Sequence, residues 1–315
     1  LPPAESRPYF IAHRPFMRLL TVCLNPTFQI TMVFPSLLLG EVNRAKEHYL
    51  DSSGKGMNTA RVLAQLGHDA FLLSHLGRER KHEFIRMAEK DRVTVLWADS
   101  KSEIRTCITV LGNGQTTELI QEPEPVGSGT EGPIRELFTQ ALETVDGVII
   151  TGTRAGGYAH DLYPEFVKEA KQKGLFVLLD LKGDDLRNSL IHRPDIIKPN
   201  MSEFVQTFFN RTIGEREMDS SLESEVRGLM KQIHESYGTI TYLSRGKEES
   251  WIQGETFHTV TPEPVEAVNT IGCGDTLSAV LAVELMEHGD LLRAAETATC
   301  WAGVNARQTR PGTIH

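Results

Sequence analysis

The sequence is poor in cysteine, in long apolar runs and in positive charge. Its four cysteines, at positions 23, 107, 273 and 300, form no C-x-x-C pair, which argues against a disulfide framework and a structural zinc site. No apolar run approaches the roughly 18 residues of a membrane-spanning helix, so no membrane partner is expected. The 33 lysines and arginines are outnumbered by 42 acidic residues, and a net charge of −9 argues against a nucleic-acid partner. We therefore expect a cytoplasmic protein with reduced thiols.

Of two common nucleotide-binding motifs, one is missing and the other lies in the wrong place. No G-x-x-x-x-G-K-[ST] segment occurs, which excludes the P-loop class. The segment Gly127-Ser-Gly-Thr-Glu-Gly132 matches G-x-G-x-x-G, but it follows a proline-rich stretch rather than the first apolar strand. We interpret it as a flexible loop.

The pattern that is present is typical of an α/β protein. Leu19–Leu24 is a continuous apolar run that stops at Asn25-Pro26, as a buried parallel strand would. Strand and helix patterns then alternate as in doubly wound α/β units. We expect strands at 70–76, 93–97, 147–151, 176–181, 196–197, 239–244, 250–252 and 257–260, and helices at 57–67, 79–90, 133–143, 162–173, 222–235, 276–287 and 291–307.

Two β-rich stretches interrupt this alternation. They cover about residues 28–50, with patchy strand-like alternation at 28–34 and 42–50, and residues 104–121, where Gly112-Asn113-Gly114 is a hairpin signal. Because no helix separates their strands, we expect a small second sheet that forms a lid over the ends of the main strands. Residues 1–16 are rich in proline and arginine and are predicted to be a flexible extension, with residues 17–315 forming one domain.

The clearest chemical signal is Asn269-Thr-Ile-Gly-Cys-Gly-Asp275. Gly272 and Gly274 bracket Cys273 at the start of an apolar helical run, where backbone amides and the helix dipole favour an anion. The dipole is expected to keep the Asp275 carboxylate ionised, so that it can accept a proton from an attacking hydroxyl. The pattern predicts half of a kinase site. The alternative is a glycine-rich turn that only starts a helix.

With this loop, the sequence resembles the ribokinase-like (PfkB) carbohydrate kinases, in the branch of 1-phosphofructokinase and tagatose-6-phosphate kinase. The resemblance runs from Arg18 to Gly312. Besides 269–275, it rests on an ordered set of segments: Leu20-Thr-Val-Cys-Leu-Asn-Pro26, Gly40-Glu-Val-Asn-Arg44, Ser53-Gly-Lys-Gly-Met-Asn58, Glu122-Pro-Glu-Pro125 and Lys198-Pro-Asn-Met-Ser-Glu203. It implies a three-layer α/β/α sandwich of Rossmann type with a small β-sheet lid.

The resemblance also implies roles for individual residues. Asp275 is the implied catalytic base, and the implied anion hole is Gly272, Cys273 and Gly274. The substrate side is assigned Gln29, Gly54, Lys55, Gly56, Asn58, Arg105, Thr153 and Arg154. The ATP side is assigned Lys198, Asn200, Glu203, Ser244, Gly246 and Asn305, with Glu203 organising Mg²⁺.

Several positions depart from the family pattern. Gln29 stands where N-P-A-x-D has a carboxylate, and Cys107 and Thr109 stand where the T-R-x-N-x-K lid strand has Asn and Lys. Arg105 is retained and is expected to hold a substrate phosphate, with Arg44 or Arg154 as helpers. On the nucleotide side, Glu249 replaces the second glycine of S-x-G-x-x-G.

Three functions remain open at this stage. The first is an ATP- and Mg²⁺-dependent kinase for a phosphosugar such as fructose 1-phosphate, fructose 6-phosphate or tagatose 6-phosphate. The second is a kinase for an unphosphorylated sugar or nucleoside, and the third is a catalytically weakened sugar or nucleotide sensor. A requirement for a monovalent cation is undecided, and a homodimer through the lid is expected because exposed sheet edges tend to pair.

Overall fold

The computed structural model describes residues 16–213 and 220–315. It contains a nine-stranded sheet and a four-stranded sheet. Residues 1–15 of the expected extension lie outside the described part. Among the described residues, no helix is both long and apolar enough to span a bilayer.

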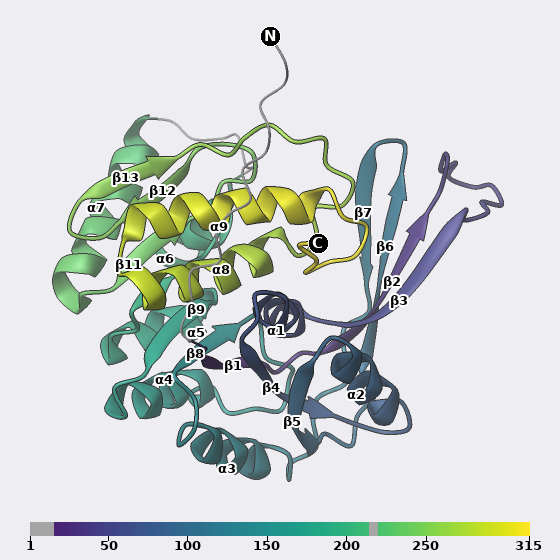
Figure 1. Ribbon diagram of the computed structural model, residues 1–315, viewed down its shortest axis with the longest axis horizontal. Coiled ribbons are helices and arrows are strands. Elements are labelled where there is room, and N and C mark those ends of the chain that lie inside the picture. The colour runs from purple at the N-terminus through teal and green to yellow at the C-terminus, as the bar shows by residue number, and fades with distance from the viewer. Residues whose placement is uncertain (1–15, 214–219) are drawn as a thin grey trace.

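The nine-stranded sheet forms the body of the molecule (Figure 1), in the order β13-β12-β11-β10-β9-β8-β1-β4-β5. Its strands are β1 (Arg18–Cys23), β4 (Asp69–Leu76), β5 (Val93–Asp99), β8 (Gly147–Thr151), β9 (Phe176–Asp180), β10 (Ile196–Ile197), β11 (Ile240–Leu243), β12 (Ser250–Gln253) and β13 (Phe257–Val260). Neighbours are parallel except where β12 pairs with β11 and β13. Leu20 and Val22 of β1 enter one buried core and Leu19 and Cys23 the other, so apolar residues of the strand are buried on both sides of the sheet.

Helices cover both faces of this sheet. One face carries α1 (Lys55–Gln65), α2 (Lys81–Lys90), α8 (Cys273–His288) and α9 (Leu291–Ala306). The other carries α3 (Glu131–Ala141), α4 (Leu162–Gln172), α5 (Gly183–Ser189), the short 3₁₀ helix η1 (Leu190–His192), α6 (Met201–Phe209) and α7 (Ser220–Tyr237). The predicted α/β/α sandwich is confirmed.

Sequence patterning missed two helices on the second face, α5 and α6. Helix α6 begins after Asn200, whose side chain accepts from the backbone N–H of Glu203, while the Glu203 carboxylate accepts from the backbone N–H of Asn200. This reciprocal capping box is a helix-start signature. The family resemblance assigns these two residues to ligand binding alone, so it gives no sign of the helix that they start.

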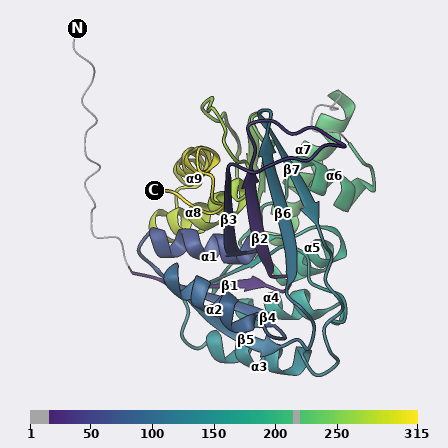
Figure 2. The ribbon, with the colours of Figure 1, turned by 90° about the vertical axis from the view of Figure 1, so that its right-hand side faces the viewer.

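The four-stranded sheet is the lid. Its order is β3-β2-β6-β7, with β2 (Thr27–Val33), β3 (Glu47–Ser53), β6 (Arg105–Gly112) and β7 (Gln115–Ile120). Figure 2 shows these strands side by side in front of the body. Residues 42–46, expected to begin a strand, are instead a loop that leads into β3. The lid joins two segments far apart in the sequence through the parallel pairing of β2 with β6.

Candidate active site

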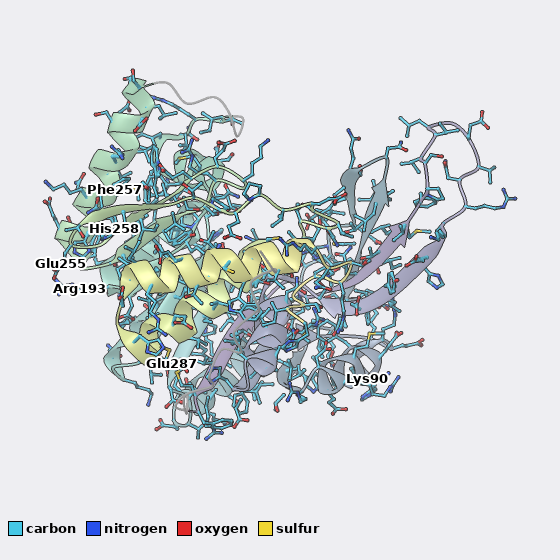
Figure 3. The ribbon with its side chains drawn as sticks, turned by 45° about the horizontal axis from the view of Figure 1, so that its top comes forward. Lys90, Arg193, Glu255, Phe257, His258 and Glu287 are labelled. Atoms are coloured by element: carbon cyan, nitrogen blue, oxygen red, sulfur yellow. The ribbon has the colours of Figure 1, made fainter. Side chains whose placement is uncertain are left out.

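Helix α8 directs its first turn toward the lid. In Figure 3, Glu287, near the other end of α8, lies on the side of the molecule away from the lid. The N-cap Gly272 has φ 86°, and a Cβ there would lie 2.6 Å from the backbone nitrogen of Gly312. Only glycine allows this approach. The first-turn amides of Cys273 and Gly274 stand where N–H groups have no acceptor within a helix, and such a turn favours an anion.

Asp275 lies in this first turn and is only 6% exposed. Its Oδ2 accepts a hydrogen bond of 2.8 Å from Nδ2 of Asn58 on α1. Burial raises the pKa of Asp275 to about 6, against the opposing effects of Lys55 and Asn58. Desolvation is the largest influence on this carboxyl and opposes its ionised form. A carboxyl with this pKa is ionised at neutral pH and is still basic enough to take a proton.

Four charged side chains gather beside Asp275. Asp180, at the carboxyl end of β9, lies 3.4 Å from Nζ of Lys55 through Oδ1 and 3.4 Å from Nζ of Lys198 through Oδ2. Oε1 of Glu203 lies 3.6 Å from the Lys55 ammonium. Asp180 raises the pKa of Lys55. Burial alone would raise the pKa of Asp180, but the two ammonium groups outweigh burial and hold this pKa below its usual value. The cluster therefore places two ammonium groups, balanced by two carboxylates, next to the α8 amides.

The start of α6 adds oxygen ligands to this cluster. The capping box uses Oε2 of Glu203, which leaves Oε1 directed at Lys55. Ser244, at the end of β11, forms a bridge with Asn200, and its carbonyl accepts from the backbone N–H of Met201 at 3.0 Å. Gly246 follows in an exposed turn with φ 62°. Except for Asn305, the predicted nucleotide-side residues thus lie near the ends of β10 and β11.

Asn305 has a different position. It is fully buried, and its Oδ1 accepts from the backbone nitrogens of Gly312 and Thr313 at 2.8 and 3.2 Å. Its Nδ2 donates to the carbonyl of Ile271 at 3.0 Å and to Sγ of Cys273 at 3.3 Å. Both ends of the amide therefore tie the 271–273 loop to the C-terminal segment. Asn305 therefore holds this loop, and the nucleotide contact predicted for it stays a prediction.

On the substrate side, α1 starts at two constrained glycines. Gly54 has φ 108°, and a Cβ on Gly56 would lie 2.6 Å from Cβ of Cys23 on β1. This close packing brings Lys55 and Asn58 to the carboxyl edge of the sheet. The glycines explain why α1 can begin so close to the strand.

The lid contributes a neutral pair. Nε2 of Gln29 donates to Oγ1 of Thr109 at 2.8 Å and to the carbonyl of Cys107 at 3.3 Å. Gln29 and Thr109 are 3% and 0% exposed. Two departures from the family pattern are thus hydrogen-bond partners of each other.

The two candidate phosphate-binding arginines differ in how they are held. Arg105 lies with Nη2 3.4 Å from the carbonyl of Asn25, and its Nη1 is 3.6 Å from the exposed Glu122. The Asn25 amide donates to Oγ1 of Thr153 at 3.4 Å, so Thr153 and Arg105 both contact Asn25. The guanidinium of Arg154 is held instead by two bonds to Oδ1 of Asp185, at 3.2 and 3.1 Å, and one to the Tyr158 carbonyl. Arg44 is exposed in the loop before β3.

Comparisons with known proteins agree with this geometry. The family model described as pfkB family carbohydrate kinase matches residues 25–314. The chain belongs to this family. This kinase is therefore a phosphotransferase with an alcohol group as acceptor.

Solved structures of the same fold include three structures of two phosphofructokinase-type proteins. Phosphofructokinase-2 from Escherichia coli in complex with potassium is 20% identical, with a TM-score of 0.80 and coverage of 93% of this chain and 94% of that chain. Its tetrameric inhibited form is 20% identical, with a TM-score of 0.79 and coverage of 92% and 94%. A possible 1-phosphofructokinase from Thermotoga maritima is 18% identical, with a TM-score of 0.81 and 93% coverage of both chains. At these identities the likeness establishes the fold.

The donor groups of this kinase fit the ATP and Mg²⁺ that its family implies. Lys55 and Lys198 offer two ammonium groups beside the first turn of α8, which suits nucleotide phosphates. The carboxylate of Glu203 is a hard oxygen ligand of the kind that Mg²⁺ prefers. Asp180 was missed by sequence reasoning, although a carboxylate ending a buried parallel strand was a usable signal.

Proposed function

We propose that this kinase transfers the γ-phosphoryl group of ATP to a hydroxyl of a phosphosugar of the fructose 1-phosphate, fructose 6-phosphate or tagatose 6-phosphate type. The observation that carries the proposal is Asp275, a buried carboxyl with a pKa of about 6 in the first turn of α8. Its position beside the first-turn amides of α8 and two lysines supplies a base and charge neutralisation in one place.

The chain's own groups divide the work as follows. Asp275 accepts the proton of the acceptor hydroxyl, while Asn58 holds the carboxylate in place. The amides of Gly272, Cys273 and Gly274 and the ammonium of Lys198 neutralise the charge that develops on the moving phosphoryl group. ATP with Mg²⁺ supplies that group when bound.

The remaining groups bind and orient. Glu203 takes the metal side, and Lys198, Asn200, Ser244 and Gly246 face the nucleotide. On the acceptor side we assign Gln29, Gly54, Lys55, Gly56, Asn58, Arg105 and Thr153. Arg105 is assigned the acceptor's phosphate, because Arg154 is committed to Asp185. The lid excludes water from the reacting groups.

A second candidate is a kinase for an unphosphorylated sugar or a nucleoside. The neutral pair of Gln29 and Thr109 favours it, because this pair leaves the lid without the lysine of the family pattern. A catalytically weakened sensor is the third candidate. Coupled ADP detection with fructose 1-phosphate, fructose 6-phosphate, tagatose 6-phosphate, ribose and adenosine tests all three. Turnover only with phosphosugars supports the main proposal, turnover only with ribose or adenosine supports the second, and no turnover with any acceptor supports the sensor.

We further propose a homodimer that forms through the lid. Ile30 pairs with Leu50 and Ile108, and Ile108 pairs with Leu119, so one apolar row crosses all four strands. Leu50 and Leu119 are 37% and 54% exposed, and a second lid would cover them. Light scattering tests the proposal: Leu119→Lys is expected to give monomers, and a monomeric unmodified chain overturns it.

Three further assignments belong to the same proposal. Residues 17–315 act as one kinase domain with the lid as part of it, preceded by an extension. The protein works in the cytoplasm, where ATP and sugar phosphates are available. A monovalent cation is a candidate activator, motivated by the potassium complex of the E. coli structure. Activity in potassium compared with tetramethylammonium salts decides the last point.

A further inference from the structure

The side chain of Asn58 is fixed at both ends. Its Nδ2 donates to Oδ2 of Asp275 at 2.8 Å. Its Oδ1 accepts from Oγ of Ser53 at 2.9 Å and from Nη1 of Arg61 at 3.0 Å. A flipped amide would turn its NH₂ group toward these two donors and its oxygen toward the Asp275 carboxylate. The two donors therefore determine that Asn58 presents a donor to the base.

Arg61 makes several hydrogen bonds besides the one to Asn58. It lies one helical turn after Asn58 on α1 and is 1% exposed. Nε is 2.8 Å from Oδ2 of Asp91, Nη2 donates to the carbonyl of Ser52 at 2.5 Å, and Nη1 also donates to the carbonyl of Pro311 at 2.8 Å. These acceptors come from the end of α2, the lid strand β3 and the C-terminal segment. The planar guanidinium is thus locked in one orientation.

We propose that Arg61 is a positioning residue for the catalytic base, acting through Asn58. It fixes the amide so that Nδ2 faces Asp275, and it links this amide to the lid strand and to the C-terminal segment that packs on Gly272. The inference deepens the proposed function and rests on Asp275 being the base. Arg61 itself is not placed in contact with substrate.

The competing role for Arg61 is purely structural. Arg310 joins Asp91 to Asp51 of β3 by ion pairs of 2.8 and 2.6 Å, so Arg61 also belongs to a network that ties α2 to the lid. If this were its only role, replacing it would lower stability and leave the base unchanged. The charged and titratable groups that act on Asp275 are Lys55, Asp180, Lys198 and Cys273, and none of them contacts Arg61 in the described structure.

The test uses Arg61→Lys in the full chain. Lysine keeps the charge beside Asp91 but lacks the fork that reaches Asn58. We expect kcat to fall about tenfold with KM for ATP little changed, and the pKa of Asp275 to rise by about one pH unit, the scale of one lost hydrogen bond to a carboxylate. The pKa is followed by carboxyl ¹³C NMR of the unliganded protein, with the resonance assigned through Asp275→Asn. This readout does not depend on turnover, so it separates failure of the inference from failure of the proposed kinase reaction.

Two comparisons make the result decisive. In an Asn58→Ala background, Arg61→Lys should change the Asp275 titration little, because the path to the base is already cut. Arg92→Lys is the matched control, since Arg92 donates to the Ala64 carbonyl of the same helix at 2.9 Å without reaching Asn58. If Arg61→Lys does not fold, Ser53→Ala removes the other donor to Asn58 and should shift the titration in the same direction. An unmoved Asp275 titration in the folded Arg61 variant, or in Ser53→Ala where that variant is needed, overturns the inference.

Discussion

The charged residues beside the first turn of α8, here called the transfer end of the site, and the buried pair on the lid are held by different interactions. Beside α8, Asp275, Asp180, Lys55 and Lys198 are charged groups in close contact, and most are buried. On the lid, Gln29 and Thr109 form a neutral hydrogen bond. Charges that hold one another in a desolvated site are costly to change singly, whereas a neutral pair can be exchanged at smaller cost. We therefore expect substitutions beside α8 to affect the transfer reaction itself, and substitutions of the neutral lid pair to affect mainly the preference among acceptors.

Asp275→Asn should give the largest effect. Loss of the base is expected to lower kcat about 10³-fold while ATP and acceptor still bind, as measured by coupled ADP detection and calorimetry. Asp184→Asn, at an exposed position of α5, is the matched control. A ligand response that survives with unchanged turnover would show that Asp275 is not the base and would favour the sensor.

The same substitution, Asp275→Asn, is expected to lower activity but to raise the free energy of unfolding. Because the folded-state pKa of Asp275 is about 6, above its usual 3.8, the folded state binds this proton more tightly than the unfolded state. Asp275 therefore costs stability as pH rises from about 4 to about 6, and the full cost is present at neutral pH. Asparagine lacks this cost, so Asp275→Asn is expected to stabilise the fold by roughly 3 kcal/mol near neutral pH. Denaturant unfolding checks the value, and a loss of stability contradicts it.

Arg105→Ala tests the lid side and should have the next largest effect. We expect KM for a phosphosugar to rise about 30-fold with a smaller change in kcat, because a bidentate phosphate contact is lost. Arg187→Ala, on the exposed side of α5, is the control. Equal losses for phosphorylated and unphosphorylated acceptors would contradict a phosphate-binding role.

The pH dependence of kcat/KM tests the charged residues of the transfer end. Protonation of Asp275 should lower kcat/KM below about pH 6, by about tenfold at one unit below that value. Asp180 raises the pKa of Lys55, so this lysine stays protonated near neutral pH. Its titration therefore causes no change of kcat/KM in that range. In Arg105→Ala the acid limb should stay in place while KM changes. If the pH at which kcat/KM falls were shifted in Arg105→Ala, the lid and the transfer end would be coupled.

Thr109→Val should give the smallest effect. It removes the hydroxyl that accepts from Gln29 and frees the glutamine amide, so we expect a change of about three-fold in kcat/KM and a shift in relative preference among acceptors. Thr106→Val, on the same strand but with the side chain on the other face, is the control. An equal change for every acceptor would place the pair outside the acceptor site.

Much of the body was predictable because its signals are local. Strands β8, β10 and β13 have the bounds expected from their apolar runs, and α8 was found from its helical pattern. The lid strand β3 was placed too early, because the patchy alternation of 42–50 does not show where pairing with β2 begins. Helix α6 was missed, since its capping box was interpreted as chemistry alone.

The sequence by itself identified residues 269–275 as a candidate phosphate-binding loop. Its glycines, the helix start and Asp275 lie within seven consecutive residues and can be recognised without a distant partner. Only the tertiary structure decided how these groups are tuned. Asn58 meets Asp275 across 217 residues of sequence, and Lys55 meets Asp180 across 125. Asn305 holds the loop from inside the core, and burial raises the pKa of Asp275 to about 6. Desolvation and long-range hydrogen bonds depend on what packs around a group, which a linear pattern does not contain.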